Sequence, residues 1–351
     1  MKKKLLSVLM AAVMVAGVGG VGAAQVKADD EKILGAGIYS ASDNFNSYIG
    51  KAITNACDGI FKTNIEDGQN DQSTQNNQVD TMLAKGASVV AVSVCDVTAA
   101  PTLIQKCKDA GNVPIIFFNK EITDCDVINS YENAYQVTST GGDYGASIQA
   151  QMVIDYWKEH PEMDKNGDGK LQLVYLMGDP GHTASQPRCD YLKSTIEDAG
   201  IEIDLLAEDT GMWVTATAKE KMDAWVSKYG DEIECCVAGN DAMALGALSA
   251  VEAAGFNTDG EESSKYIPIY GIDALPEILS KIESGEITGS VLQDAKTQGQ
   301  TIVKMAENLT SGKDAVDGIE GVETEEEAKA VRVPYQAITK DNLDLAKSTY
   351  E

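Results

Sequence analysis

Basic side chains are scarce in this chain of 351 residues, because 28 Lys and Arg stand against 55 Asp and Glu, a formal net charge of −27. Residues 1–28 hold four lysines and no acids, so the remainder has 24 basic and 55 acidic side chains, or −31. Such a surface repels the phosphates of nucleic acids and anionic lipid head groups. The composition therefore argues against a nucleic-acid partner and favours a well-solvated surface.

The sequence also lacks the cysteine spacing of a metal site or a disulfide framework. Its seven cysteines are Cys57, Cys95, Cys107, Cys125, Cys189, Cys235 and Cys236. Their number is odd and no pair has the CxxC spacing, so neither a zinc site nor a complete set of disulfides is indicated. The last two lie in an apolar run, where we expect them to be buried as small hydrophobic side chains.

The first 28 residues have the features of a secretory signal peptide. Three lysines are followed by an apolar run from Leu5 to Val21 and by a small-residue cleavage site that ends at Ala28. The run is nearly long enough to span a bilayer, so an uncleaved membrane anchor is the alternative. No cysteine lies near its end, which does not support a lipid-anchored form. Both alternatives predict export to an extracytoplasmic location, either the periplasm or the cell surface and medium.

From residue 32 onward, strand-like apolar runs alternate with helical segments. KILGAGIY, ASVVAVSV and PIIFFNKE are such runs in the first half, and LQLVYLM, ECCVAG and YIPIYGID in the second. This alternation predicts right-handed crossovers and parallel sheets covered by helices on both faces. The length allows two domains, and no Pro/Ser-rich linker separates the halves. We therefore expect an α/β protein of two domains between which the chain passes more than once.

The segment DKNGDGKLQ at 164–172 has the pattern of a calcium loop. Asp164, Asn166 and Asp168 alternate, a glycine follows, and Gln172 takes the ninth position. Oxygen ligands on alternate residues around a tight turn suit Ca²⁺, although the pattern also occurs in solvated turns. The twelfth position, where a bidentate Glu would complete the shell, is Tyr175 within an apolar strand. A distant part of the chain must therefore supply the missing carboxylate.

Polar and aromatic residues follow the predicted strands, at the edge where α/β sheets bind ligands. They are Asp43, Phe45, Ser93, Asn119, His182, Arg188, Trp213, Asn240, Asp273 and Gln293. The set has one Arg and no Lys, whereas phosphate recognition would require more positive charge. Sugar hydroxyls both donate and accept, and pyranose C–H faces stack on aromatic rings. The set favours a neutral sugar, although aromatic residues and a single histidine at such positions are often only structural.

Ten blocks of the sequence resemble the periplasmic galactose/glucose-binding proteins over essentially the whole mature chain. They are SDNF (42–45), DGQNDQSTQNNQVD (67–80), FFNKE (117–121), DKNGDGKLQ (164–172), PGH (180–182), MW (212–213), KMDAW (221–225), NDAMALGA (240–247), GIDALPE (271–277) and VRVPY (331–335). The resemblance implies the type I periplasmic-binding-protein fold, with two Rossmann-like, doubly wound parallel-sheet domains joined by a three-stranded hinge. The implied division is a signal peptide at 1–28, an N-terminal lobe of 29–113 plus 294–331, and a C-terminal lobe of 114–293 plus 332–351.

The implied function is that of a monomeric, non-enzymatic solute-binding protein. Such a protein captures D-galactose, D-glucose or a methyl-galactoside between its lobes and delivers the sugar to the membrane permease of an ABC transporter, with a chemoreceptor of chemotaxis as a further candidate partner. Position by position, the resemblance implies stacking by Phe45 and Trp213, and a bond from Asp43 to the hydroxyl that distinguishes glucose from galactose. It implies that the remaining hydroxyls and the ring oxygen are bonded by His182, Arg188, Asn240 and Asp273.

The resemblance also completes the calcium shell. It implies that Glu234 supplies the distant carboxylate, and that the ligands are Asp164, Asn166, Asp168, the backbone carbonyl of Lys170, Gln172 and Glu234. Three cleft positions depart from the family pattern. Ser93 and Gln293 each replace an Asn, and Ala184 replaces an Asp that bonds the anomeric hydroxyl. We therefore expect a weaker or broader site that admits a glycoside, or a different pentose or hexose.

Two other classes of protein remain as alternatives. A glycosidase would use a pair of carboxylates such as Asp43 and Asp273, one protonated and one ionised. A sugar-responsive repressor shares the sensor fold but would require an amino-terminal helix-turn-helix, and the signal-like segment occupies that place.

Overall fold

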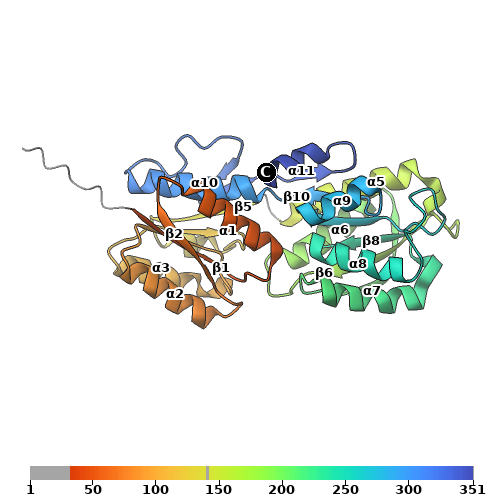
Figure 1. The fold of residues 1–351 in the computed structure, drawn as a ribbon, viewed down its shortest axis with the longest axis horizontal. Helices are drawn as coiled ribbons and strands as arrows, with labels where there is room; N and C mark the ends of the chain where they lie inside the picture. The colour runs from red at the N-terminus through yellow and green to blue at the C-terminus, as the bar shows by residue number, and fades with distance from the viewer. Residues whose placement is uncertain (1–31, 140–141, 351) are drawn as a thin grey trace, which may run out of the picture. The chain divides into compact units, whose positions relative to one another are not determined.

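The computed structural model of the protein describes residues 32–139 and 142–350. The signal peptide expected at 1–28 and its alternative, a membrane anchor, lie outside the described residues. The described part contains two β-sheets, each flanked by helices (Figure 1). None of the helices within these ranges is long and apolar enough to cross a membrane.

The first sheet has seven strands. In spatial order they are β11 (Glu323–Glu325), β12 (Ala330–Val333), β5 (Ala134–Ser139), β4 (Ile115–Phe118), β3 (Val89–Val92), β1 (Ile33–Ile38) and β2 (Lys62–Asp67). All neighbours pair in parallel except β11 with β12. The helices of this part are α1 (Asn44–Ala56), α2 (Gln72–Ala84), α3 (Ala100–Asp109), α4 (Cys125–Asn129) and α10 (Ala295–Thr310).

The second sheet has six strands. In spatial order they are β13 (Gln336–Ile338), β10 (Gly289–Leu292), β9 (Ile269–Asp273), β8 (Cys235–Ala238), β6 (Lys170–Met177) and β7 (Glu202–Thr210). Only the pair of β10 and β13 is antiparallel. The helices of this part are α5 (Gly142–Glu159), α6 (Ser185–Asp198), α7 (Thr215–Tyr229), α8 (Asp241–Ala253), α9 (Pro276–Ser284) and α11 (Leu343–Tyr350).

The alternating direction of the side chains along each strand explains why each sheet is covered on both faces. Ile116 and Phe118 of β4 pack with α1 and α10, whereas Ile115 and Phe117 point to the opposite face and pack with α2 and α3. Successive side chains of a strand point to opposite faces, so a continuous apolar run requires helices on both sides. The second sheet is built in the same way, and the predicted α/β architecture of two parallel-sheet domains is confirmed.

The chain passes between the two sheets after β5, after β10 and after β12. The expected lobe boundaries require a correction. The division implied by the resemblance places residues 114–139 in the C-terminal lobe, but β4 and β5, which lie in this range, pair in the first sheet. The expected boundary at 331/332 cuts β12, which lies wholly in the first sheet. The physical reason is that sheet membership is decided by hydrogen bonds between distant strands, which local periodicity does not reveal.

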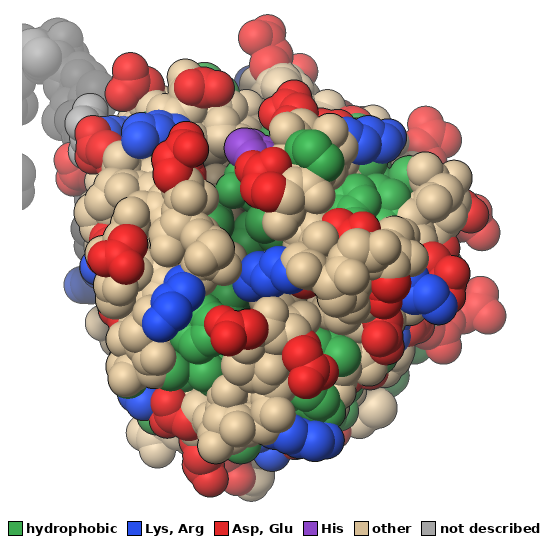
Figure 2. Space-filling view, turned by 90° about the vertical axis from the view of Figure 1, so that its right-hand side faces the viewer, with side chains coloured by type: hydrophobic (Ala, Val, Ile, Leu, Met, Phe, Trp, Pro, Cys, Tyr) green, Lys and Arg blue, Asp and Glu red, His purple; other side chains and the backbone are tan. Residues whose placement is uncertain are grey.

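All seven cysteines lie in the described residues and none of them forms a disulfide. Cys235 and Cys236 are buried in β8, as predicted. The surface carries the acidic excess. In the space-filling view of one face, Asp and Glu side chains are spread over the surface and Lys and Arg occur at separate places (Figure 2). No basic patch of the kind that tracks a phosphate backbone is visible on this face.

Candidate functional site

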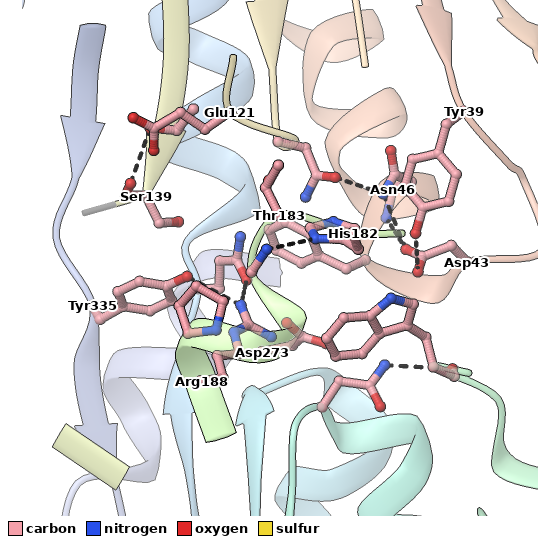
Figure 3. Close-up of a pocket in the computed structure, with 18 of the residues that line it drawn as sticks. Tyr39, Asp43, Asn46, Glu121, Ser139, His182, Thr183, Arg188, Asp273 and Tyr335 are labelled. Carbon is pink, nitrogen blue, oxygen red and sulfur yellow. Dashed lines mark hydrogen bonds between the residues drawn. The ribbon is translucent and has the colours of Figure 1, made fainter. Parts of the chain in front are cut away.

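A cavity of about 350 Å³ lies at the carboxyl ends of the strands and is lined by residues from both sheets and from the crossovers (Figure 3). Nine of the ten residues predicted from the sequence line it, namely Asp43, Phe45, Asn119, His182, Arg188, Trp213, Asn240, Asp273 and Gln293. The tenth, Ser93, does not. It is completely buried, and its hydroxyl lies 3.5 Å from Oδ1 of Asn119, which does line the cavity. The structure therefore places Ser93 behind the wall of the site.

The carboxylate of Asp43 is held by three hydrogen bonds from the protein. As the N-cap of α1 it accepts from the backbone N–H of Asn46 at 2.8 Å, and the side-chain Nδ2 of Asn46 donates to the same oxygen at 3.1 Å. The hydroxyl of Tyr39 donates to the other oxygen at 2.6 Å. Burial, followed by the charge of Asp43, raises the pKa of Tyr39, so this hydroxyl stays a donor. The carboxylate is consequently a fixed acceptor.

Trp213 enters the cavity from a backbone conformation that few residues other than glycine adopt, with φ of +63°. Its ring occupies space that only glycine leaves free at Gly178, where an added Cβ would lie 2.0 Å from Cζ2 of the indole. The imidazole of His182 meets the indole edge-to-face, with 5.3 Å between the ring centroids. Phe45, in the first turn of α1, is buried in the core of the first sheet and lines the cavity. The site therefore contains two aromatic surfaces.

Arg188 is buried and bonded to both the second sheet and a crossover. Its guanidinium donates to the backbone oxygen of Gly239 at 2.6 Å, to Oε1 of Gln293 at 2.9 Å and to the hydroxyl of Tyr335 at 3.1 Å. Burial opposes its charge, but Tyr335 and Asp273 raise the pKa of the guanidinium, so Arg188 remains a cation. Its Nε is buried without a hydrogen-bond partner. A buried donor of this kind is stabilised by a ligand oxygen.

Asn240 and Asp273 lie at the carboxyl ends of two neighbouring strands. The side chain of Asn240 accepts from the N–H of Met243, which caps α8, and its Nδ2 lies 3.4 Å from the backbone oxygen of Trp213. Asp273 is 3% exposed and has a φ of +124°, a strained value for a residue with a side chain. Burial, with a further contribution from Asp241, raises the pKa of Asp273 well above its usual value.

His182 serves the cavity as a neutral ring. Its Nδ1 accepts a hydrogen bond from the N–H of Ala184 at 3.1 Å, which leaves the proton on Nε2. Burial, together with the positive charges of Lys120 and Arg188, lowers its pKa well below 6.5. The imidazole therefore presents one fixed N–H donor at neutral pH.

Several lining residues were not predicted from the sequence. They are Tyr39, Asn46, Glu121, Thr123, Thr138, Ser139, Thr183, Pro187, Tyr191, Arg332 and Tyr335. Some of them stood within the blocks that carried the resemblance, since Glu121 ends FFNKE and Arg332 and Tyr335 belong to VRVPY. Their proximity depends on the pairing of β12 beside β5, which the sequence pattern did not reveal.

The predicted calcium loop folds tightly and is joined by the predicted distant carboxylate. Gly167 and Gly169 have φ of +73° and +75°. Both oxygens of Asp164 accept from loop N–H groups, of Asp168 at 3.0 Å and of Gly169 at 2.9 Å. Glu234, only 1% exposed, accepts from the N–H of Lys165 at 2.6 Å and of Gln172 at 3.0 Å. The two segments therefore meet although they are far apart in the sequence.

Two observations bear on whether a cation fits there. Oε1 of Gln172 is buried without a hydrogen-bond partner, and burial raises the pKa of Glu234, although two backbone N–H groups and the charge of Lys165 oppose the shift. Within residues 32–139 and 142–350, no group of three or more His, Cys, Asp or Glu side chains is placed so that it could hold a metal ion. The donor set is nevertheless chemically suited to calcium, because amide and backbone oxygens complete it.

The fold and the cavity define a two-lobed binding protein with its ligand site between the lobes. The chain belongs to the family described as "Periplasmic binding protein domain", which it matches over residues 36–314, and it has the type I fold of that family. It is 42% identical over 313 residues to the D-galactose/methyl-galactoside binding periplasmic protein MglB of Haemophilus influenzae, covering 88% of this chain and 90% of that one.

Two further relatives agree with this membership. A putative rhizopine-binding protein of Rhizobium meliloti is 29% identical, with 85% of this chain and 88% of the relative covered. The solved structure of an ABC transporter solute binding protein from Bacillus halodurans, with bound myo-inositol, has a TM-score of 0.71 and 26% identity. The match covers 91% of this chain and 98% of that one. Proteins of this family bind solutes outside the cytoplasm and serve ABC transporters.

Proposed function

We propose that this protein binds a neutral hexose, D-galactose or D-glucose, in the cavity between its sheets and delivers it to the permease of an ABC transporter. The observation that carries the proposal is the pairing of two aromatic surfaces with fixed polar groups in one cavity. Phe45 and Trp213 offer ring faces, and Asp43, Asn240 and Arg188 offer acceptors and donors. The name of the Haemophilus influenzae relative supports galactose and its methyl glycoside as ligands.

Each polar group has a role that follows from its environment. Asp43 is an anchored acceptor for a hydroxyl, and it distinguishes the two epimers by where that hydroxyl points. The unpartnered Nε of Arg188 and the Nε2–H of His182 donate to sugar oxygens. Asn240 and Asp273 bond hydroxyls on the second-sheet side. Hydrogen bonds to charged groups contribute about 1.5–3 kcal/mol each, which is sufficient for tight binding of a small polyol.

The mechanism is closure of the two lobes about the three crossovers. Gln293 and Tyr335 lie at two of these crossovers and accept from Arg188, so the guanidinium connects the ligand site to the hinge. A sugar that contacts both lobes binds the closed arrangement better and shifts the population toward it. The closed protein then presents a surface to the permease. The same surface would be presented to a chemoreceptor, the further candidate partner.

We propose a non-enzymatic role for the site. The Asp43 carboxylate is held by Tyr39 and Asn46, as an acceptor fixed in place rather than a free nucleophile. A glycosidase built on Asp43 and Asp273 would release nitrophenol from a nitrophenyl glycoside, and we expect no turnover.

We also propose a structural calcium ion at the loop before β6. Its ligands would be Asp164, Asn166, Asp168, the carbonyl of Lys170, Gln172 and Glu234. When bound, the ion neutralises the acidic groups gathered there and joins the loop to the residue that precedes β8. The orphaned Oε1 of Gln172 and the buried carboxylate of Glu234 support this proposal.

Isothermal titration calorimetry with D-galactose and D-glucose tests the sugar proposal. Asp43→Asn keeps the helix cap but loses the charge, so we expect hexose affinity to fall about 10- to 100-fold. Asp71→Asn is the matched control, because Asp71 caps α2 in the same way and does not line the cavity. Absence of heat and of thermal stabilisation with every hexose would overturn the proposal.

A further inference from the structure

We propose that the cleft continues past the hexose into a second subsite, and that this subsite takes a neutral, hydroxylated aglycone such as the second ring of a disaccharide. The inference rests on the proposed sugar function and specifies the class of substrate. The cavity has an acidic end near Glu121 and Ser139 and an apolar stripe on α6, neither of which the proposed hexose contacts use.

The cavity is larger than a single sugar ring requires. A void of about 150 Å³ is enough to hold one benzene ring. The cavity here has about 350 Å³, more than twice that volume and at the lower end of the range of about 300–1,000 Å³ for ligand pockets. A pyranose is likewise one six-membered ring, with hydroxyls added. Room remains for a second group attached to the sugar.

The cavity has two polar ends that are separate from one another. At one end Tyr39 and Asn46 hold Asp43, and at the other lie Glu121 and Ser139, with His182 between the two ends (Figure 3). The far end is contributed by the segment after β4, by the end of β5 and by β12. A hexose that bonds Asp43 and stacks on Trp213 leaves this far end unoccupied.

The far end offers acceptors, not a free cation. Arg332 lines it, but its guanidinium makes four hydrogen bonds and one further ion-pair contact within the protein. Two of its bonds form a fork with Glu121 at 2.7 and 2.9 Å, others reach Glu325, and one reaches the hydroxyl of Thr138. Two carboxylates against one guanidinium leave a net negative charge, and carboxylate oxygens accept more than one hydrogen bond. This end therefore suits hydroxyl donors and repels anions.

Helix α6 supplies a further part of the lining. Ala184, Pro187 and Tyr191 follow each other at helical spacing and all line the cavity, with Arg188 on the same face. Tyr191 is 48% exposed, so its ring is available to a ligand. Ala184 contributes only a methyl group to this part of the lining. An apolar, aromatic stripe and an acidic end within one cavity together have the composition that recognises a sugar ring.

The test compares ligands that differ only beyond the first ring. By calorimetry, we expect a galactosyl or glucosyl disaccharide, in at least one of the α1,6 and β1,4 linkages, to bind at least as tightly as the methyl glycoside. Hexose 1-phosphate should bind at least tenfold more weakly than the methyl glycoside, because the carboxylates of Glu121 and Glu325 repel its phosphate.

Tyr191→Ala locates the subsite. We expect disaccharide affinity to fall about two- to tenfold, the effect of losing one ring contact, with the affinity for free hexose unchanged. Tyr144→Ala is the matched control, because Tyr144 is similarly exposed at 52% and does not line the cavity.

The outcomes separate this inference from the proposed function. Binding of free hexose without binding of any disaccharide overturns the second subsite and leaves the hexose site intact. Disaccharide binding that Tyr191→Ala leaves unchanged also overturns it, because the second ring then lies elsewhere. Tighter binding of hexose 1-phosphate than of the methyl glycoside contradicts the acidic character of the subsite. If neither hexose nor disaccharide binds, the proposed function itself fails.

Discussion

The indole of Trp213 lies so close to Gly178 that a Cβ at this glycine would come within about 2.0 Å of Cζ2 and 2.1 Å of Cη2 of the ring. Trp213 can therefore take this position only because residue 178, which follows β6, is a glycine. Since Gly178 follows the strand directly, the sheet itself fixes the height of the stacking surface in the cleft.

Gly178→Ala should displace the indole and lower hexose affinity by about tenfold or more, because stacking and the associated burial are lost together. Calorimetry measures the affinity, and a change in tryptophan emission, assigned with a Trp213→Phe variant, reports the displacement. Gly181→Ala is the control, because an added Cβ there meets only the carboxylate of Asp179, with the nearest oxygen at 3.4 Å, an ordinary contact. If Gly178→Ala binds the hexose as tightly as Gly181→Ala does, the indole of Trp213 does not contact the sugar.

The C-terminal helix stabilises the backbone of a cleft residue. The hydroxyl of Tyr350 donates to the backbone oxygen of Asp273 at 3.2 Å, and its ring meets Tyr48 of α1 edge-to-face at 4.9 Å. Asp273 is in a strained conformation that its surroundings must maintain. Tyr350→Phe keeps the ring and removes one hydrogen bond, worth about 0.5–1.5 kcal/mol. We expect a two- to tenfold loss of hexose affinity, measured by calorimetry, and unchanged affinity would contradict this role.

Calcium should stabilise the fold by mass action. At a hundredfold excess over its dissociation constant, a ligand of the folded state adds about 2.7 kcal/mol. A chelator should therefore lower the melting temperature of the protein, and Glu234→Gln should remove most of the response to added calcium. Glu202→Gln is the control, since Glu202 pairs with the Lys170 side chain and is no proposed ligand. A melting temperature that does not change with chelator would rule out the proposed site.

The stability of the fold should fall as the pH rises from about 4 to about 8. Asp241 is fully buried between Ser290, which donates to Oδ1, and the N–H of Leu275, which donates to Oδ2. Burial raises its pKa from 3.8 to about 8, with Glu277 adding to the shift and Arg188 opposing it. The folded state then binds a proton that the unfolded state has lost, and unfolding becomes easier with rising pH.

Asp241→Asn should be more stable than the parent protein at pH 8, by about 1 kcal/mol or more, because one pKa unit corresponds to about 1.4 kcal/mol. Asparagine keeps an acceptor for Leu275 and a donor for Ser290. Urea unfolding at pH 5 and pH 8 measures the change. If the variant loses as much stability as the parent between these values, the pH dependence has another origin.

The sequence was sufficient for the architecture because each buried strand of the two sheets is a continuous apolar run. It was also sufficient for most of the cleft, because the carboxyl ends of parallel strands converge on one edge. It did not reveal Arg332 and Tyr335, which lie on or beside strands of three or four residues, too short for a periodic pattern. The same limit misplaced the boundary at residue 113, since only pairing with β3 assigns β4 to the first sheet. Ser93 is buried outside the lining, and Asn119, whose Oδ1 lies 3.5 Å from the Ser93 hydroxyl, lines the cavity in its place.

The central claim is that Trp213 and its polar neighbours bind a hexose, and a fluorescence titration tests it most directly. The protein has three tryptophans, so Trp213→Phe is needed to assign the signal. We predict a saturable change with D-galactose or D-glucose in the parent protein, no change with D-ribose, and loss of the signal in the variant. Absence of a saturable change and of any thermal shift with every hexose would contradict the account.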